Sequence, residues 1–213
     1  MIGVIALAII TWVFVSLMQK SQYGLASNLV TAPIGRARII TLTVVTAGLY
    51  IFYWLYITWK QLRDNLHPAN KVGDTADPSQ TFFPVWHALT MLVPVYNMFR
   101  LHRHVELVRD MAVESGIETS LNPKLVVLLI LLNTILGLTS SGVHSVPYLF
   151  ILNAISLALI TTSILWTQAT LNEYWSKTSE GDDREMPIQL GEKAFTLIGI
   201  VLWGSVIGGL FFN

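Results

Sequence analysis

The sequence predicts an all-α membrane protein: a polytopic bundle of about six transmembrane helices with one amphipathic helix that extends into the cytoplasm. Hydrophobic residues make up 53% of the 213 residues and charged residues only 12%, whereas soluble domains carry about 25% charged residues. The mean hydropathy is +0.58, and the apolar residues gather into six charge-free runs. Because no linker interrupts these runs, we expect one integral membrane domain over residues 1–213.

The charge balance and the absence of cysteine exclude several classes of function. The 13 Lys and Arg residues equal the 13 Asp and Glu residues, so net charge gives no reason to expect a nucleic-acid partner. With no cysteine in the chain, disulfides, thiolate catalysis and Cys-ligated zinc or iron–sulfur clusters are excluded.

Six runs define the expected spans: residues 2–18, 39–59, 82–99, 123–139, 148–171 and 194–212. Most approach the ~20 residues that a helix needs to cross about 30 Å of hydrocarbon. The fourth run is the weakest, because its apolar part has 14 residues and would reach only ~21 Å. No positive segment precedes the first run and no small-residue cleavage site follows it, so we expect a retained helix rather than a secretory signal.

Three sequences typical of helix starts favour helices over barrel strands. A residue that commonly caps helices stands shortly before a proline in each of them. These sequences contain Asp77 with Pro78 and Gln80, Asn122 with Pro123, and Ser145 with Pro147.

The distribution of Lys and Arg orients the chain. If all six runs span, loops 19–38, 100–124 and 172–193 share one side and carry ten of these residues, against three on the other side. The positive-inside rule then places the first group in the cytoplasm. An alternative with the same ten-to-three count treats the run 82–99, which contains two prolines, as a re-entrant hairpin.

Residues after the third run predict the amphipathic helix. Its apolar residues recur at steps of three and four, which forms one stripe, at Met98, Leu101, Val105, Val108 and Ala112. We expect this stripe to pack on the bundle, the alternative being contact with an anionic membrane surface or a partner.

Six aromatic residues occupy ten consecutive positions, 50–59. On a helix they point to two opposed sides, whereas a ligand face would be one-sided, and Lys60 follows them. This pattern favours a belt at the membrane interface, and a pigment or quinone site would need a second helix for its other wall. The candidate interface anchors are Tyr50, Tyr53, Trp54, Tyr56, Trp59, Trp166, Tyr174 and Trp175.

The segment "ARIITLTVVTAGLYIFYWLYITWKQLRDNL" combines a Thr-x-Gly-Leu-Tyr motif, an aromatic pair and a basic continuation. The residues of this pattern are Thr46, Gly48, Leu49, Tyr50, Tyr53, Trp54, Lys60 and Arg63. In these features it resembles the bacterial integral membrane family called domain of unknown function 4234, most strongly over residues 36–100. The resemblance implies a membrane location and a helical fold, and it implies no activity, cofactor or catalytic residue.

Ionisable groups are almost absent from the six runs. With the fourth run taken at its apolar limits, 125–138, none contains Asp, Glu, Lys or Arg, which counts against a proton pump, a carboxylate-coupled sodium transporter and a voltage sensor. His87 is the one group there that titrates near neutral pH, and we expect it to bond a neighbouring helix. His102 and His104 lie two apart, so on a helix they point apart and form no metal pair.

Uncharged polar and small residues mark candidate contacts between helices. Gln168 and Asn172 share one helix face, as glue between helices or as a polar pocket for a solute or head group. Gly204 and Gly208 form a GxxxG pair, and Gly48 also permits a close helix approach. No Gly-rich phosphate loop, Ser/His/Asp arrangement or HExxH motif appears, so no catalytic, cofactor or metal residue is assigned.

These observations favour a non-catalytic multi-pass protein of the bacterial cytoplasmic (inner) membrane. We expect an accessory or scaffold subunit, or an envelope-maintenance protein, with membrane lipids and other integral membrane subunits as partners. The alternative is a carrier or channel for a neutral or lipid-like solute that uses polar groups on the fifth helix. No cofactor is predicted; a pigment, a quinone or a lipid is the alternative.

Overall fold

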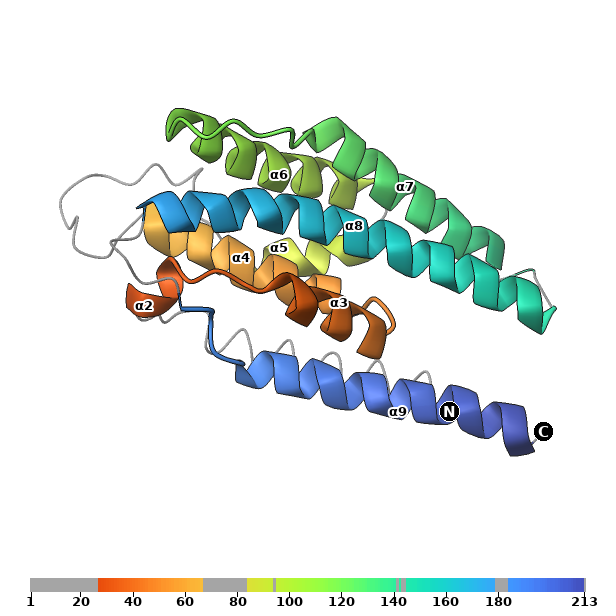
Figure 1. Cartoon of the computed structure of the whole chain (residues 1–213). Helices are drawn as coiled ribbons and strands as arrows, with labels where there is room; N and C mark the ends of the chain where they lie inside the picture. Colours follow the sequence, from red (N-terminus) through yellow and green to blue (C-terminus); the bar gives the residue numbers. More distant parts are fainter. Residues whose placement is uncertain are drawn as a thin grey trace.

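The computed structural model describes residues 27–66, 84–93, 95–140, 142, 145–178 and 184–212 (Figure 1). Within these segments every regular element is a helix, so the predicted all-α class is confirmed there. The elements are α2 (Ser27–Val30), α3 (Arg36–Val45), α4 (Tyr50–Leu66), α5 (Pro84–Leu89), the 3₁₀ helix η2 (Thr90–Leu92), α6 (Tyr96–Glu114), α7 (Pro123–Ser140), α8 (Val146–Thr178) and α9 (Leu190–Phe212). The expected span 2–18 and the expected cap at Asp77 lie outside the described residues.

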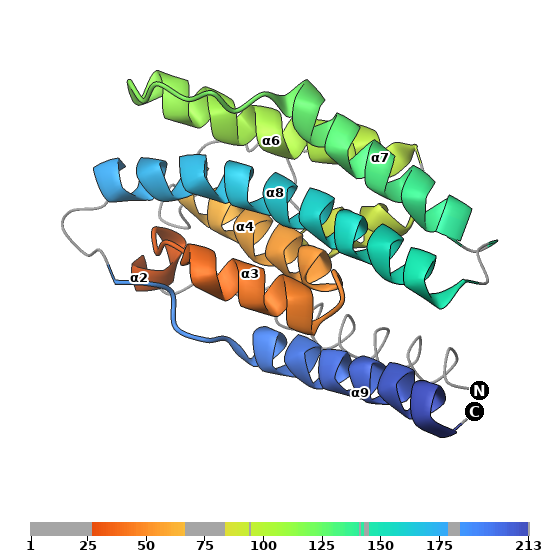
Figure 2. The ribbon, with the colours of Figure 1, turned by 45° about the vertical axis from the view of Figure 1, so that its right-hand side comes forward.

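The run 39–59 is a helical hairpin, so the single span predicted there is wrong. At the end of α3 the Gly48 N–H donates to Thr43 O at 2.8 Å and the Ala47 N–H donates to Val44 O at 3.0 Å. This pair of bonds is the Schellman motif, which ends a helix with a residue in the left-handed region; here Ala47 has φ +49° and Gly48 φ +87°. The chain then reverses, and α4 returns antiparallel to α3 (Figures 1 and 2).

Thr46 joins the two helices of this hairpin. Its Oγ1 donates to Leu42 O at 2.7 Å and accepts the Tyr50 N–H at 2.8 Å, which caps the start of α4. Gly48 faces α8, where a Cβ would lie 3.2 Å from Ile160 Cδ1. The close approach predicted at Gly48 therefore occurs in a turn rather than within a helix.

The run 82–99 is also not one helix. α5 has six residues and rises only ~9 Å, η2 follows it, and Val95 has φ +68° immediately before α6. α6 then runs toward the end of the molecule opposite the α3–α4 turn (Figures 1 and 2). The single straight helix expected over this run is therefore wrong, and the reversal is the geometry that the re-entrant alternative requires.

α6 is the predicted amphipathic helix. Leu101, Val105, Val108 and Ala112 on its apolar stripe are buried, and the helix packs on α7 and α8. A second Schellman motif ends it at Gly116. The stripe thus covers the protein's own bundle, as expected, rather than a membrane surface.

α7 and α8 form a long antiparallel hairpin. Within the described residues they are the two helices long and apolar enough to cross a membrane, and only 17% of each apolar window is buried. The predicted cap of α7 is confirmed, because Asn122 Oδ1 accepts the Lys124 N–H at 3.0 Å. The six-span bundle as a whole is not confirmed.

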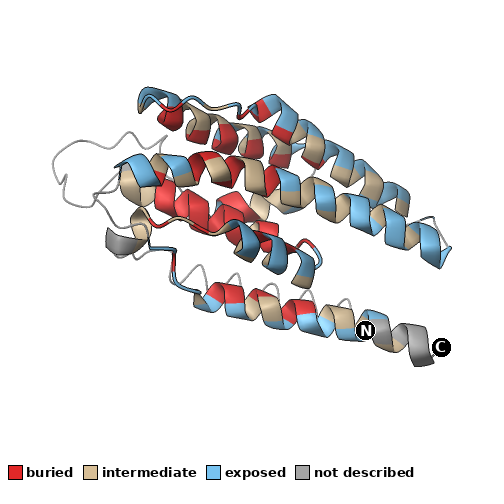
Figure 3. Ribbon diagram, in the orientation of Figure 1, coloured by how far each residue is buried: buried red, intermediate tan, exposed pale blue. Residues whose placement is uncertain are grey.

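The core lies around α4, which packs against α2, α3, α5, α8 and α9. Buried residues concentrate on α4 and on the C-terminal half of α8, whereas α7 and the N-terminal half of α8 are largely exposed (Figure 3). Four stretches contain no charged residue: 39–59, 84–99, 125–172 and 194–212. They include the connections between α3 and α4, between α5 and α6 and between α7 and α8, and the end of α9. The reversals between α3 and α4 and between α5 and α6, and the adjoining ends of α7 and α8, point to one end of the molecule (Figures 1 and 2), so the described part is divided into a charge-free end and a charged end.

Candidate functional site

The aromatic stretch of α4 forms the centre of the protein. Five of the predicted anchors are at most 4% exposed: Tyr50, Tyr53, Trp54, Tyr56 and Trp59. Trp175 is also fully buried, while Trp166 and Tyr174 are half-buried. An interface anchor must face lipid and water, so this role is wrong for the six buried rings. A helix that is apolar on all sides can be enclosed by protein as well as by lipid, and sequence periodicity does not separate the two.

A buried pair of histidines connects α5 with α6. His87 Nε2 and His104 Nδ1 lie 3.1 Å apart, and the side chains are 1% and 0% exposed. The ring of Trp59 stacks on His87 with the centroids 3.9 Å apart. The expectation that His87 bonds a neighbouring helix is confirmed, and its partner is His104 on the amphipathic helix α6. His102 is half-exposed, so the two histidines of α6 do point apart.

The hydrogen bonds around this pair assign its protons. Thr58 Oγ1 donates to Trp54 O at 2.7 Å, so its oxygen accepts from His104 Nε2, 3.4 Å away. His104 Nδ1 must then accept from His87 Nε2–H. His87 Nδ1 remains an acceptor with no hydrogen-bond partner among the described residues.

The chemistry open to this pair is narrow. Burial, and secondly the charge of Arg100, lowers the pKa of His104 to about 3, so this ring is neutral at physiological pH. Among the described residues no group of three or more His, Cys, Asp or Glu side chains could hold a metal ion. The arrangement fixes the orientation of two helices and presents one buried acceptor nitrogen.

A second polar cluster uses the residues predicted to be glue or a pocket. Trp54 Nε1–H donates to Gln168 Oε1 at 2.7 Å, and Gln168 Nε2–H donates to Asn172 Oδ1 at 2.7 Å. Asn172 also bonds both backbone groups of Ile34, at 2.8 Å to the carbonyl and 3.1 Å from the N–H. These contacts link α4, α8 and the segment before α3, which favours the role of glue.

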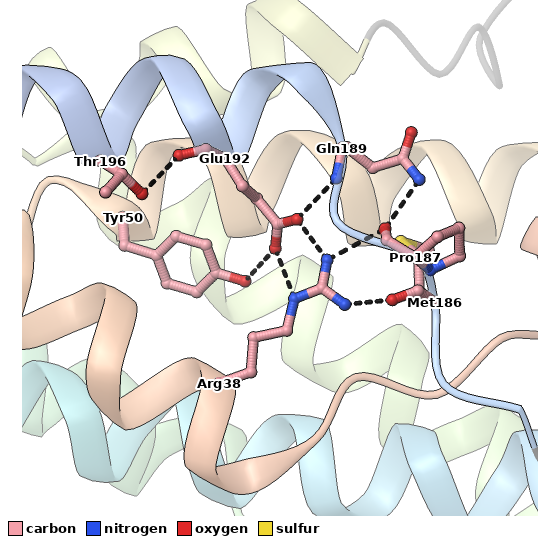
Figure 4. A network of polar contacts seen from close by, with 7 residues as sticks. All are labelled: Arg38, Tyr50, Met186, Pro187, Gln189, Glu192 and Thr196. Carbon is pink, nitrogen blue, oxygen red and sulfur yellow. Dashed lines mark hydrogen bonds and ion pairs between the residues drawn. The ribbon is translucent and has the colours of Figure 1, made fainter.

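A third cluster, an ion pair between α3 and α9, is absent from the sequence predictions (Figure 4). Glu192 is 1% exposed, and Arg38 binds both of its carboxylate oxygens, with Nε donating to Oε1 at 2.9 Å. The Tyr50 hydroxyl donates to Oε1 at 3.3 Å, and the Gln189 N–H donates to Oε2 at 2.9 Å. The carboxylate is therefore fully occupied, and charge-assisted bidentate pairs of this kind are among the stronger hydrogen bonds.

The remaining donors of Arg38 bind the chain just before α9. They contact the carbonyl oxygens of Met186 and Pro187. Burial lowers the pKa of Arg38. The hydrogen bond and the charge of Glu192 raise this pKa by more than burial lowers it, so the net shift is upward. The sequence did contain one signal for this site, because Gln189 and Glu192 have the spacing of a capping box.

Close packing of α9 occurs at different glycines from those predicted. No described residue lies within 4 Å of a Cβ built on Gly204 or Gly208. A Cβ on Gly191 would overlap the ring of Tyr53, and one on Gly199 would overlap the Val45 carbonyl oxygen. Among the described residues the contacts of α9 with α4 and α3 therefore use Gly191 and Gly199.

Comparison with known proteins adds no assignment. No family model, curated protein or solved structure matches the chain. The resemblance to domain of unknown function 4234 therefore stays a prediction.

Proposed function

We propose that this protein is a non-catalytic integral membrane protein that serves as an accessory or scaffold subunit of a membrane complex. The observation that carries the proposal is a contrast between interior and exterior. Gln168, Asn172 and Glu192 are bonded to neighbouring segments inside the protein, while apolar faces of α7 and of the N-terminal half of α8 are exposed among the described residues.

The interior contacts favour packing over transport. Gln168 and Asn172, which a carrier would need for its solute, are bonded to Trp54, to each other and to the Ile34 backbone. A side chain that already has its partners must lose them before it can bind a solute, and a buried group left unpaired costs ~1–3 kcal/mol. We therefore do not favour the carrier alternative.

The exterior supplies surface for lipid and for partner helices. Among the described residues, the side of α7 that faces away from α6 and α8 is exposed, with its exposed apolar residues at Leu125, Leu128, Leu131, Leu132, Ile135 and Leu138. Helix association in membranes depends on close van der Waals packing and a few polar contacts. A partner subunit on this face would need only a complementary helix surface.

The charged end supports an orientation with that end in the cytoplasm. Lys and Arg are absent from the charge-free stretches that carry the hairpin turns, and those of the described residues lie toward the other end. The positive-inside rule places such an end on the cytoplasmic side. We infer a bacterial cytoplasmic membrane, which agrees with the predicted family resemblance.

Purification from native membranes in a mild detergent tests the proposal, with a photo-cross-linking residue at Leu128 and a matched control at Val113. Both residues are exposed and apolar, at 46% and 58%, but Val113 lies at the charged end. We expect a discrete complex with another integral membrane protein, cross-linked from Leu128 and not from Val113. Recovery of a lone monomer that is cross-linked only to lipid would overturn the accessory role.

A further inference from the structure

We propose that the hairpin α5–η2–α6 is a re-entrant membrane insertion, whose apolar tip enters one leaflet of the bilayer before the chain returns to the same side. The proposal rests on the membrane location inferred above and adds a specific lipid-binding surface to it. We define the hairpin tip as Trp86, Leu92, Val93, Val95, Tyr96 and Phe99.

The hairpin tip is apolar and exposed. Its six side chains are 50–70% exposed, and residues 84–99 contain no Asp, Glu, Lys or Arg. An exposed apolar cluster of this kind in a protein marks a surface that meets an apolar partner. The first charged residue beyond the tip is Arg100, one position after Phe99.

The position of the tip in the molecule identifies lipid as that partner. The tip lies at the charge-free end, and α6 packs on α7, a helix apolar enough to cross the membrane. In Figures 1 and 2 the start of α6 lies beside α7, part-way along that helix. If α7 is surrounded by hydrocarbon, the adjacent exposed tip is immersed to a partial depth in the same leaflet.

The backbone at the reversal is suited to an environment without water. The Val93 N–H donates to Thr90 O at 3.0 Å, the Asn97 N–H to Val93 O at 3.0 Å and the Met98 N–H to Val95 O at 3.1 Å. The Asn97 side chain adds a bond to Met91 O at 3.4 Å. An unsatisfied backbone N–H or C=O group costs several kcal/mol away from water, and these bonds satisfy groups at the turn.

The two legs of the hairpin are too short or too polar to cross the bilayer. α5 rises only ~9 Å, and α6 carries Arg100, Arg103 and Glu106 within its first eleven residues. The His87–His104 pair ties the legs together close to the tip. This contact between the legs favours insertion of the hairpin into the bilayer as one unit.

A depth measurement tests the proposal directly. The chain has no cysteine, so a single Val93→Cys carrying an environment-sensitive fluorophore can be reconstituted into phosphatidylcholine and phosphatidylglycerol vesicles. We expect its emission to shift to the blue, with strong quenching by spin labels on lipid chains near the head group and little quenching by aqueous iodide. Val113→Cys, at the other end of α6 and 58% exposed, is the matched control and should be quenched by iodide.

Leu131→Cys on α7 separates this proposal from the proposed function. If Leu131→Cys reports lipid and Val93→Cys reports water, the re-entrant insertion is overturned while the membrane location stands. If both report water, the membrane location fails and the insertion fails with it.

Side-specific labelling provides the second arm. Lys71→Cys, in the connection between α4 and α5, and Glu114→Cys, at the end of α6, should react with an impermeant maleimide from the same side of the membrane. Reaction of the two positions from opposite sides would mean that residues 82–99 cross the bilayer, and the proposal would be wrong.

Discussion

The Glu192 carboxylate receives hydrogen bonds from Arg38, from the Tyr50 hydroxyl and from the Gln189 N–H, and is almost completely shielded from solvent. Removal of one partner from such a pair leaves an uncompensated buried charge, which costs about 3–5 kcal/mol. We expect Glu192→Gln to lower the thermal unfolding midpoint in detergent strongly, because the Arg38 guanidinium stays buried without its counterion.

Glu106→Gln is the matched control for this change. Glu106 pairs with Arg103 one helical turn away, and the Arg103 side chain is 63% exposed. Exposed pairs contribute about 0–1 kcal/mol, so the midpoint of this variant should stay close to that of the wild type. Equal losses in the two variants would contradict a stabilising role for the buried pair.

The buried histidine pair predicts a pH dependence of stability. His104 has a pKa of about 3 in the folded protein and 6.5 as its ordinary value. Between these values the unfolded chain binds a proton that the folded chain does not, so stability decreases as the pH falls. From pH 7 to pH 5 we expect a loss of about 2 kcal/mol from this residue, measured as a lower unfolding midpoint.

Two variants isolate this contribution. The groups around His104 are His87, Thr58, Trp54, Trp59 and the cationic Arg100. His104→Gln cannot titrate and should show a shallower decrease between pH 7 and pH 5. His102→Gln, on the exposed side of the same helix, should keep the wild-type slope. A wild-type slope in His104→Gln would rule out this histidine as the source.

The sequence could identify His87 as an unusual residue but not its partner. His87 stands out because it is the one titratable group near neutral pH in a charge-free run. His104, 17 residues later in the chain, contacts His87 only because the chain reverses between α5 and α6. The same limit applies to Arg38 and Glu192, which are separated by 154 positions.

At the scale of elements, α9 packs on α3 through a glycine outside the predicted GxxxG pair. Gly199 has no room for a Cβ, because the Val45 carbonyl oxygen and the Thr46 Cα occupy that position. We expect Gly199→Ala to destabilise the protein by about 1–3 kcal/mol, the usual effect of overpacking, with the unfolding midpoint as the measurement.

Gly204→Ala provides the comparison within the same helix. No described residue lies within 4 Å of its Cβ position, and alanine favours a helix over glycine by roughly 0.5–1 kcal/mol. The midpoint should therefore stay the same or rise. A larger loss from Gly204→Ala than from Gly199→Ala would restore the predicted GxxxG pair as the packing surface of α9.

Two of the expected helices are hairpins for a reason that hydropathy does not detect. The residues at the reversal of run 39–59, Thr46 to Leu49, are small or apolar, and the Schellman bonds satisfy their backbone within the turn. A hydropathy profile counts side chains and ignores where the backbone groups bond. It therefore reports one continuous apolar run where the chain has ended one helix and begun another.

At the scale of the whole molecule, the same apolar composition serves two different environments. The apolar residues of α4 are enclosed by five other helices, whereas those of α7 are mostly exposed. Both helices are rich in large apolar side chains. Burial in protein and burial in lipid satisfy such side chains equally, so the aromatic belt predicted on α4 proved to be the core of the protein.

The sequence by itself determined what depends on short-range physics: the helical class, the apolar hairpin of α7 and α8, the inward stripe of α6 and the cap at Asn122. Only the tertiary structure decided where the chain reverses, which helix lies at the centre and which partners meet, among them His87 with His104 and Arg38 with Glu192. Helix propensity, capping and hydropathy act over a few residues and can be read locally. The contacts of a buried side chain depend on how distant helices are brought together, and chain reversals at a few turn residues decide that.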